Sequence, residues 1–288
     1  DLPKLEVDFA TVSSTDLLKY CRRDVEIIKL AMEKYFTMIE VNDLGRFSLT
    51  KASQAFTAFR HRFMKVPISL HKHPEAIELE RACYMGGRTE AFRMGQIKDG
   101  PFVMLDINSM YPFIMANTPV PTRLTYMEDN PHPDRVHRLL SHNAVQAEVD
   151  ITTDEPAYAT HYNERICFPV GSFTAFLGST GLKYALEHNH VRKIKRLAWY
   201  DRAVVFSDYV EFFYTLRKHY QIEKNPIFAL MSKDLLNTLY GKFAQYKPII
   251  EEKEELDGPD YERIETIDLV RGVKLVEYKL LNKRFTEI

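Results

Sequence analysis

The stretch PFVMLDINSMYP, residues 101–112, places an aspartate at the end of a rising apolar run. Burying a lone carboxylate costs several kcal/mol unless it is paired, protonated or bound to a metal, so its position beside Val103, Met104 and Leu105 needs a chemical reason. Asn108, Ser109 and Pro112 follow, and they are of the kind that end a strand and turn the backbone. We therefore predict that Asp106 lies at the tip of a buried strand and faces a cleft, where functional sites are commonly built.

The composition is that of a folded protein without disulfides. With 288 residues, 45% of them apolar, the chain can bury the core of one large domain or two modest ones. Its cysteines, Cys21, Cys83 and Cys167, form no CxxC pair, so neither a zinc knuckle nor a disulfide framework is indicated and a reducing compartment fits. No stretch approaches about 18 uninterrupted apolar residues, and the sequence does not start with a charged-then-apolar leader. We expect a soluble, intracellular protein.

Charge is segregated along the chain although the formal net charge is only −1. From Val191 to Lys247 there are 11 lysines and arginines against 5 acids, whereas Glu251 to Glu265 carries 8 acids against 2 bases. The basic stretch is interleaved with aromatic residues, a composition that suits a groove following phosphates and stacking bases. A solvated helical face is the alternative, and composition alone does not choose between the two.

Apolar residues recur at steps of three and four in three stretches, which predicts three amphipathic helices. These stretches are residues 15–40, about 208–222 and about 227–244. Ser14 or Thr15 is the expected cap of the first helix, and a further mostly helical region runs to about Arg62. The last two helices are joined by EKNP, with Pro226 in the first turn of the second, and so short a link predicts an antiparallel helical hairpin.

Extended segments occupy the rest of the chain. AVQAEVDI, residues 144–151, alternates as a half-buried strand does, and ACYMGGRTEAFRMG, residues 82–95, predicts strand, turn and strand around its glycine pair. The proline-marked residues 118–134 predict a connection. Residues 165–200 predict strand, loop, short helix and strand, a small inserted α/β unit with Ser179 or Thr180 as the helix cap. Beyond Pro248 the sequence is acidic and then alternates, which suggests a β-hairpin arm.

The sequence KDLLNTLYGKF, residues 233–243, places a second group of polar residues on a helix. Ile227, Phe228, Met231, Leu235 and Leu239 gather on one side of that helix. Lys233, Asn237 and Tyr240 gather roughly opposite, where a cation, an amide and a phenol on successive turns suit a bound nucleoside triphosphate. Gly241 leaves room for close approach. The alternative is a solvated helix stripe with a half-buried tyrosine.

Taken together, these stretches resemble the family B DNA polymerases. DINSMYP resembles motif A, and Lys233 with Asn237, Tyr240 and Gly241 resembles motif B. YMGG, residues 84–87, is similar to the YxGG element that links exonuclease and polymerase domains, and YCRRD, residues 20–24, to the third exonuclease motif, YxxxD. YxxxD alone is a weak signal, whereas four motifs in the family's order make chance agreement improbable.

The gap between motifs A and B holds the extra α/β unit, which resembles the first insert of protein-primed polymerases of phages, linear plasmids, and some eukaryotic viruses and mobile elements. The resemblance implies an α+β fold with a palm sheet, a helical-hairpin fingers element, this insert and the C-terminal tail of an exonuclease domain. The implied divisions are residues 1–65, exonuclease; 66–117, linker and first palm segment; 118–205, insert and palm strands; 206–247, fingers; and 248–288, the start of a second insert or β arm. Such a protein works in the host cytoplasm or in an organelle.

Residue by residue, the resemblance implies a site for two-metal nucleotidyl transfer. Asp106 would be one of two carboxylates holding two Mg²⁺ ions, which activate the primer 3′-hydroxyl and stabilise the leaving pyrophosphate. Tyr111 would lie under the incoming sugar and exclude a ribose 2′-hydroxyl by contact. The implied catalytic residues are Asp106, Tyr111 and Lys233, and the implied nucleotide-binding residues are Ser109, Met110, Tyr111, Lys233, Asn237 and Tyr240.

The same resemblance implies DNA contacts and a second metal site. The residues implied to contact DNA are Tyr84, Gly86, Gly87 and Gly241. In the exonuclease, Tyr20 would orient the attacking water and Asp24 would be a metal ligand. The implied partners are primer-template DNA, dNTPs and, for the protein-primed type, a terminal priming protein, with no membrane.

Two elements of the family pattern do not occur in the sequence. No DTD-type motif C follows motif B, and no DxE pair of the first exonuclease motif precedes Asp24, so one carboxylate stands at each of the two sites. We expect an internal fragment of a longer polymerase that by itself binds nucleic acid weakly and does not extend a primer.

Two other readings stay open at this stage. One is a polymerase of the same family that starts from an RNA or DNA primer, and the other is a nucleic-acid-binding remnant that has lost catalysis. The HxH pairs at His71 and His73 and at His188 and His190 do not indicate a metal site, since no third ligand is evident.

Overall fold

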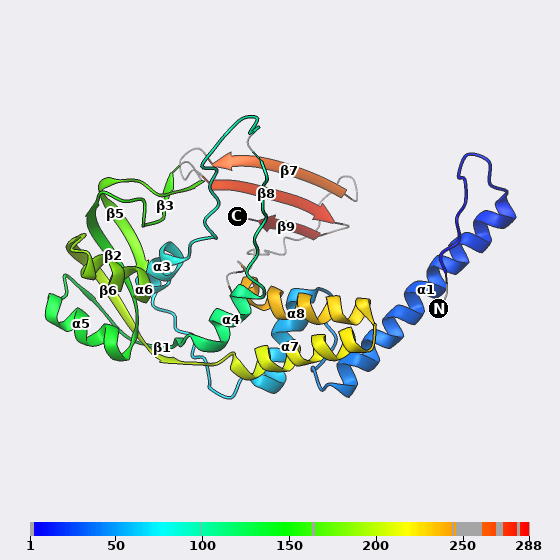
Figure 1. The fold of residues 1–288 in the computed structure, drawn as a ribbon, viewed down its shortest axis with the longest axis horizontal. Coiled ribbons are helices and arrows are strands. Elements are labelled where there is room, and N and C mark those ends of the chain that lie inside the picture. Colours follow the sequence, from blue (N-terminus) through cyan, green and yellow to red (C-terminus); the bar gives the residue numbers. More distant parts are fainter. Residues whose placement is uncertain are drawn as a thin grey trace. The chain divides into compact units, whose positions relative to one another are not determined.

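The computed structural model describes residues 3–98, 100–162, 165–243, 245, 261–268, 273–280 and 283–287 (Figure 1). The chain divides into two compact units, residues 1–242 and 243–288. The first unit combines helices with an antiparallel sheet, and the second contains a small antiparallel sheet of its own. The α+β class expected from the sequence is therefore confirmed.

Helices at the start of the first unit follow the apolar periodicity. Helix α1 (Ser14–Val41) is capped by Ser13, whose side chain accepts a hydrogen bond from the Asp16 amide, so the cap lies one residue before the expected positions. Helix α2 (Lys51–Ala58) is capped by Thr50 and continues as a π-helical turn, η1 (Phe59–Phe63). The helical region predicted to about Arg62 is thus confirmed.

A helical hairpin forms where the sequence predicts one. Helix α7 (Ser207–Ile222) and helix α8 (Pro226–Phe243) run side by side (Figure 1). The turn between them uses Lys224 in the left-handed region, at φ +56°, and Pro226 starts α8, where its missing N–H costs nothing. The buried Tyr209 hydroxyl of α7 donates to the Leu235 carbonyl of α8 at 2.7 Å and joins the two helices.

One apolar cluster holds this part of the first unit together. We call it the central core. Its buried members come from the end of α1, from α2 and η1, from α4 (Met110–Asn117), from α7 and α8, and from the segments just before α2 and α7. They are Met38, Ile39, Leu44, Ala55, Ala58, Phe59, Phe63, Met115, Val205, Phe206, Tyr209, Phe213, Leu235, Leu236 and Leu239. The central core therefore joins α4, which carries the end of motif A, to α8, which carries motif B.

The larger sheet has the order β1-β6-β2-β5 and is antiparallel throughout. Its strands are β1 (Val120–Asp129), β2 (Ala144–Thr153), β5 (Gly171–Gly178) and β6 (Val191–Ala203), and β3 (Thr160–Tyr162) pairs separately with β4 (Arg165–Cys167). Strand β2 alternates as expected from residues 144–151, with Val149 buried opposite Ala175 of β5 and Ile194 of β6.

Helices cover both faces of this sheet. Helices α5 (Pro133–His142) and α6 (Ser179–Glu187) pack on one face through Val136 and Leu182, and helix α3 (Pro74–Cys83) packs on the other through Leu79. Arg196 of β6 ties α3 to the sheet, since it pairs with Glu148 at 2.5 Å and with Glu78 at 3.1 Å. The helix predicted within residues 165–200 and the strand after it are confirmed, but two strands, β4 and β5, precede the helix where one strand and a loop are predicted. The Ser179 or Thr180 cap is not confirmed, because Gly178 occupies the N-cap.

Three expectations about extended segments are wrong. Residues 82–95 do not form strand, turn and strand, because α3, with Pro74 in its first turn, runs through Cys83 and residues 84–95 contain no strand. Residues 118–134 hold strand β1 and the start of α5 instead of a plain connection; β1 is an edge strand and has a register shift beside Pro121, which is where a strand tolerates proline.

The third wrong expectation concerns the strand before Asp106. Residues 101–107 form no strand, and their apolar side chains are exposed, Met104 by 94% and Leu105 by 88%. A strand needs a partner for its backbone, and none of the described residues pairs with this segment. Asp106 is correspondingly exposed and not buried.

The second unit is a three-stranded antiparallel sheet, β7 (Tyr261–Asp268), β8 (Val273–Leu280) and β9 (Lys283–Glu287), in that order. The alternation beyond Pro248 thus predicts strands correctly, while residues 246–260 of the acidic stretch lie outside the described residues. Among the described residues, no helix has both the length and the apolar content that crossing a membrane requires.

The buried tyrosine between α7 and α8 gives a first prediction. Replacing Tyr209→Phe removes the hydroxyl that reaches Leu235 and should lower the free energy of unfolding by about 1 kcal/mol. Tyr214→Phe, on the same helix but 42% exposed, is the matched control and should change stability little. Urea denaturation of both variants measures the difference, and equal midpoints would contradict a role for the hydrogen bond.

Candidate functional site

Three tyrosines from three separate sequence motifs meet in the first unit. Tyr84 follows α3, Tyr111 lies in the first turn of α4, and Tyr240 lies near the end of α8. The ring centroids of Tyr84 and Tyr240 are 6.3 Å apart in a stacked arrangement, and those of Tyr111 and Tyr240 are 5.3 Å apart. We call these residues the tyrosine cluster. It brings together the YxGG element, motif A and motif B.

The central core sets the position of this cluster. Helix α4 buries Pro112 and Met115, and Met115 belongs to the central core. Helix α8 buries Leu235 and Leu239 in the same core. Tyr111 precedes the buried Pro112, and Tyr240 follows the buried Leu239. Packing of the two helices therefore leaves both rings on neighbouring surfaces.

Glycines make the close approach of the linker possible. A Cβ atom added to Gly87 would lie 3.2 Å from the Tyr111 hydroxyl, and one added to Gly86 would lie 3.3 Å from Cδ1 of Ile166. Both distances are tighter than ordinary van der Waals contact. Gly241, by contrast, has open space where its Cβ would be. A side chain at either YxGG glycine would therefore have to displace Tyr111 or Ile166 slightly, whereas Gly241 leaves a free surface beside Tyr240.

Tyr240 gives the cluster a polar hydroxyl that is uncharged at neutral pH. Burial raises the pKa of Tyr240 to about 12, with smaller contributions from the neighbouring Tyr84, including a hydrogen bond to it, and from Tyr111. The ring is still 38% exposed. Tyr240 can thus offer a flat ring and a neutral hydroxyl to a base or a sugar.

Motif B lies as predicted on the exposed side of α8. Lys233 and Asn237 are exposed, and no ion pair engages Lys233 within the described part of the chain. On the opposite side of α8, Leu235 and Leu239 are buried as predicted. Ile227 is 69% exposed, so the buried apolar face does not extend to the first turn of the helix.

The structure adds a contact to α8 that the sequence does not signal. Asp234, next to Lys233, pairs with Lys51 of α2 at 2.5 Å, across a sequence separation of 183. Lys51 is in no motif, and nothing local predicts its partner. The pair gives the Asp234 carboxylate a partner other than Lys233.

Motif A starts outside regular structure. Ser109 has a left-handed backbone, φ +55°, and its carbonyl accepts the Phe113 amide in the first turn of α4, which begins at Met110. Asp106 is exposed and makes no hydrogen bond or ion pair with any described residue. The structure thus brings Tyr111 to motif B but records no contact between Asp106 and Lys233.

A metal centre is not complete among the described residues. A carboxylate oxygen is a ligand that Mg²⁺ prefers, so Asp106 suits the role of a single ligand. No group of three or more His, Cys, Asp or Glu side chains that could hold a metal occurs among the described residues. Asp106 by itself does not fit a two-metal site.

The two exonuclease-type residues lie together on α1. Lys4 Nζ is 4.0 Å from the Asp24 carboxylate and 5.7 Å from the Tyr20 ring centroid, and Phe9 packs edge-on against Tyr20. A hydrogen bond with Tyr20 and the charge of Asp24 raise the pKa of Lys4. One turn of helix thus brings Tyr20 and Asp24 to one face, but their contacts are with Lys4 and Phe9 and not with the tyrosine cluster.

The contact of Gly87 with Tyr111 gives a second prediction. In Gly87→Ala, the new Cβ must push the Tyr111 hydroxyl aside by a few tenths of an ångström, at a cost of about 1 kcal/mol. NMR should show shifted ring resonances for Tyr111 and Tyr240. Gly178→Ala, where nothing lies within 4 Å of the added Cβ, is the control. Ring resonances unchanged in both variants would contradict the contact.

The raised pKa of Tyr240 gives a third prediction. The folded state favours the neutral phenol, so this contribution to stability is complete below the ordinary pKa of 10.0 and is lost as the pH rises through about 12. Tyr240→Phe should remove one step near pH 12 from an ultraviolet tyrosinate titration and lessen the loss of stability between these two pH values. Tyr162→Phe, 70% exposed, serves as the control. If the titration near pH 12 is identical to that of the unmodified chain, Tyr240 ionises at a different pH and the prediction is wrong.

Comparisons with known proteins identify the family of the chain. The family model described as "DNA polymerase type B, organellar and viral" matches residues 10–280. A probable DNA polymerase of Ascobolus immersus is 24% identical over 243 residues, which are 79% of this chain and 19% of that protein. The DNA-directed DNA polymerase of Enterobacteria phage PRD1 is 26% identical over 168 residues, 58% of this chain and 29% of that protein.

Solved structures show the same fold. An orthorhombic crystal form of Phi29 DNA polymerase covers 100% of this chain at a TM-score of 0.60 and 17% identity, and this chain covers 50% of it. The same polymerase in complex with primer-template DNA gives a TM-score of 0.61 at 15% identity. The chain thus spans half of the solved polymerase and less than a third of the two curated relatives.

Proposed function

The chain belongs to the organellar and viral type B DNA polymerases, and from that premise we propose that it supplies the nucleotide- and template-binding part of a template-directed DNA polymerase. The tyrosine cluster is the observation that carries the proposal. Three short motifs that are distant in sequence have their aromatic residues in contact, as expected if they surround one substrate.

The proposed nucleotide site has three kinds of surface. Tyr111 presents a half-exposed ring to the incoming sugar, where its volume rejects a ribose 2′-hydroxyl. Lys233 and Asn237 lie one turn apart on the exposed side of α8 and bind the triphosphate by charge and by hydrogen bonding, assisted by backbone amides near Ser109 and Met110. Tyr240 lines the nascent base pair.

The proposed template contacts come from the linker and from the end of α8. Tyr84 stacks on Tyr240, so a residue that touches the template backbone also supports the ring beside the base pair. Gly87 allows the linker to approach Tyr111, Gly86 allows it to approach Ile166, and Gly241 leaves open space next to Tyr240. Phi29 DNA polymerase has been solved in complex with primer-template DNA and with incoming nucleotide substrates, which supports the same partners here.

Type B polymerases use divalent metal ions, and we assign Asp106 as a Mg²⁺ ligand. The metal would activate the primer 3′-hydroxyl and stabilise the leaving pyrophosphate. The other ligands must come from outside the described residues, so the residues described here account for binding and orientation of the substrates. Accordingly, we expect the 288-residue chain by itself not to extend a primer.

Finer features of the function extend the proposal. The α/β unit between the two motifs, within residues 118–205, supports protein priming from a terminal protein, and Tyr20 with Asp24 supports a 3′–5′ exonuclease in the whole protein. The divisions at residues 65, 117, 205 and 247 remain those proposed from the sequence. A polymerase that starts from an RNA or DNA primer is the alternative, and initiation on a purified terminal protein distinguishes the two.

The role of Asp106 gives the experiment that tests the proposal. In a chain extended by its flanking coding sequence, Asp106→Asn should abolish nucleotide addition, by about 10³-fold or more, while primer-template binding stays within about twofold. The substitution keeps size and removes charge. Gel-based primer extension and fluorescence anisotropy measure the two quantities. An undiminished extension rate would show that Asp106 is not a metal ligand.

A further inference from the structure

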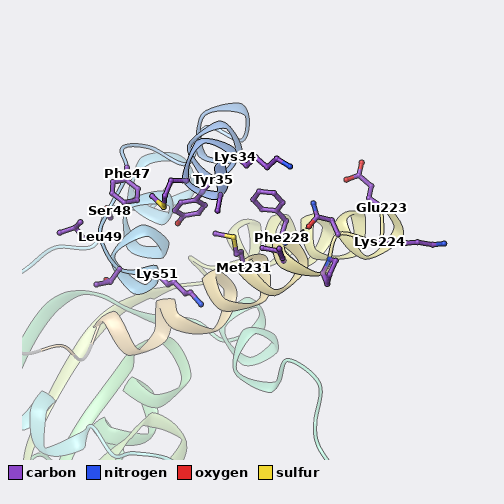
Figure 2. Close-up of a pocket in the computed structure, with 16 residues that line it drawn as sticks. Lys34, Tyr35, Phe47, Ser48, Leu49, Lys51, Glu223, Lys224, Phe228 and Met231 are labelled. Atoms are coloured by element: carbon purple, nitrogen blue, oxygen red, sulfur yellow. Dashed lines mark hydrogen bonds between the residues drawn. The ribbon is translucent and has the colours of Figure 1, made fainter. Parts of the chain in front are cut away.

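A cavity of about 750 Å³ lies at the opposite end of α8 from the tyrosine cluster (Figure 2). Its walls come from α1, from the segment between α1 and α2, and from the turn that joins α7 to α8. Figure 2 shows Tyr35 of α1 facing Phe228 and Met231 of α8 across the hollow. From Phe228 to Tyr240 the helix rises about 18 Å, so this is a separate site.

Aromatic rings from three segments line the cavity. Phe47 is 41% exposed and meets Tyr35 edge-on, with 6.2 Å between ring centroids. Phe228 is stacked on Tyr220 at 5.2 Å, which holds its ring in place. Partly exposed rings that are fixed from behind are suitable surfaces for nucleic-acid bases, because every base has a flat face that can stack.

Lysines surround these rings. Lys34, Lys51 and Lys224 line the cavity together with one acid, Glu223. Lys51 is paired with Asp234, and Glu223 lies 3.3 Å from His219. Lys34 and Lys224 have no ion pair with any described residue, so the rim keeps a net positive charge. The left-handed turn at Lys224 places one of these charges between α7 and α8.

This combination fits unpaired DNA better than a duplex. In a duplex the faces of the bases are stacked inside the helix and cannot enter the cavity. Only the phosphates of a duplex could contact the protein here. A single strand can insert one or two unstacked bases among the rings while its phosphates stay near the lysines. An acidic peptide would use the lysines but would have no need of the rings.

We propose that the cavity between α1 and the α7–α8 turn binds single-stranded DNA, with bases against Phe47, Tyr35 and Phe228 and phosphates at Lys34 and Lys224. This proposal rests on the proposed function, because it assumes a chain that handles DNA. It adds a site for the unpaired strand that is separate from the tyrosine cluster.

The test is binding of a fluorescent oligothymidylate to the 288-residue chain, measured by anisotropy over a range of salt concentrations. The double variant Lys34→Gln/Lys224→Gln should weaken binding at least tenfold at low salt. It should also lower the slope of log affinity against log salt by about 1.4, since each neutralised phosphate on a single strand releases about 0.7 counterion. Phe47→Ala should weaken binding about five- to hundredfold without changing that slope.

The matched control is Lys29→Gln/Lys218→Gln, which removes the same charge from α1 and α7 outside the cavity lining. Both double variants alter exposed lysines, so circular dichroism should show the same fold for each. Equal losses in the two variants would overturn the proposal in favour of general electrostatic attraction, and so would full competition by an acidic peptide of equal charge.

Failure of this site and failure of the proposed function give different results. If the chain binds primer-template DNA but not oligothymidylate, or binds oligothymidylate equally well in all variants, the cavity proposal is wrong and the polymerase proposal stands. If oligothymidylate binding follows the cavity variants while Asp106→Asn leaves primer extension unchanged, the cavity proposal stands and the metal role of Asp106 fails.

Discussion

The central core is the constraint on which the rest of the first unit depends. Burial of Met115 from α4 and of Leu235 and Leu239 from α8 in one apolar cluster fixes two helices that carry different motifs. Because a helix is rigid, the ring next to each buried residue has little freedom to move away. The contact between Tyr111 and Tyr240 is thus a consequence of hydrophobic packing beneath it, and the functional surface depends on residues that touch no substrate.

The two ends of α8 have different surroundings as a result. Near its C-terminal end the helix meets the linker and α4, and tyrosines with little net charge form the surface. Near its N-terminal end it faces α1 across an aromatic hollow bordered by lysines. The ion pair between Lys51 and Asp234 joins α8 to α2 between these regions. If both proposals hold, one helix contributes to two nucleic-acid contacts of different chemistry.

Local sequence patterns predict what depends on neighbouring residues and fail where a distant partner decides. The α7–α8 hairpin, α1 and β2 follow from apolar period and turn chemistry. The sequence does not predict strand β1, because Pro121 and the prolines on either side of the strand are typical of a loop, and only the place of β1 at the sheet edge makes Pro121 acceptable. Residues 101–107 have the apolar composition of a buried strand. A strand also needs a neighbouring strand to pair with, and apolar composition does not supply one.

By itself, the sequence indicated the family and the helical hairpin and supplied the residues proposed for the site, because motif letters and helical period are local properties of the chain. Tertiary structure decided which of these residues meet. It placed Tyr84 on Tyr240 and Tyr111 beside Gly87, left Asp106 exposed, and created the cavity from three segments with no shared motif. The physical reason is that contacts between distant segments depend on how helices pack around a common core, and no pattern along the chain records that packing.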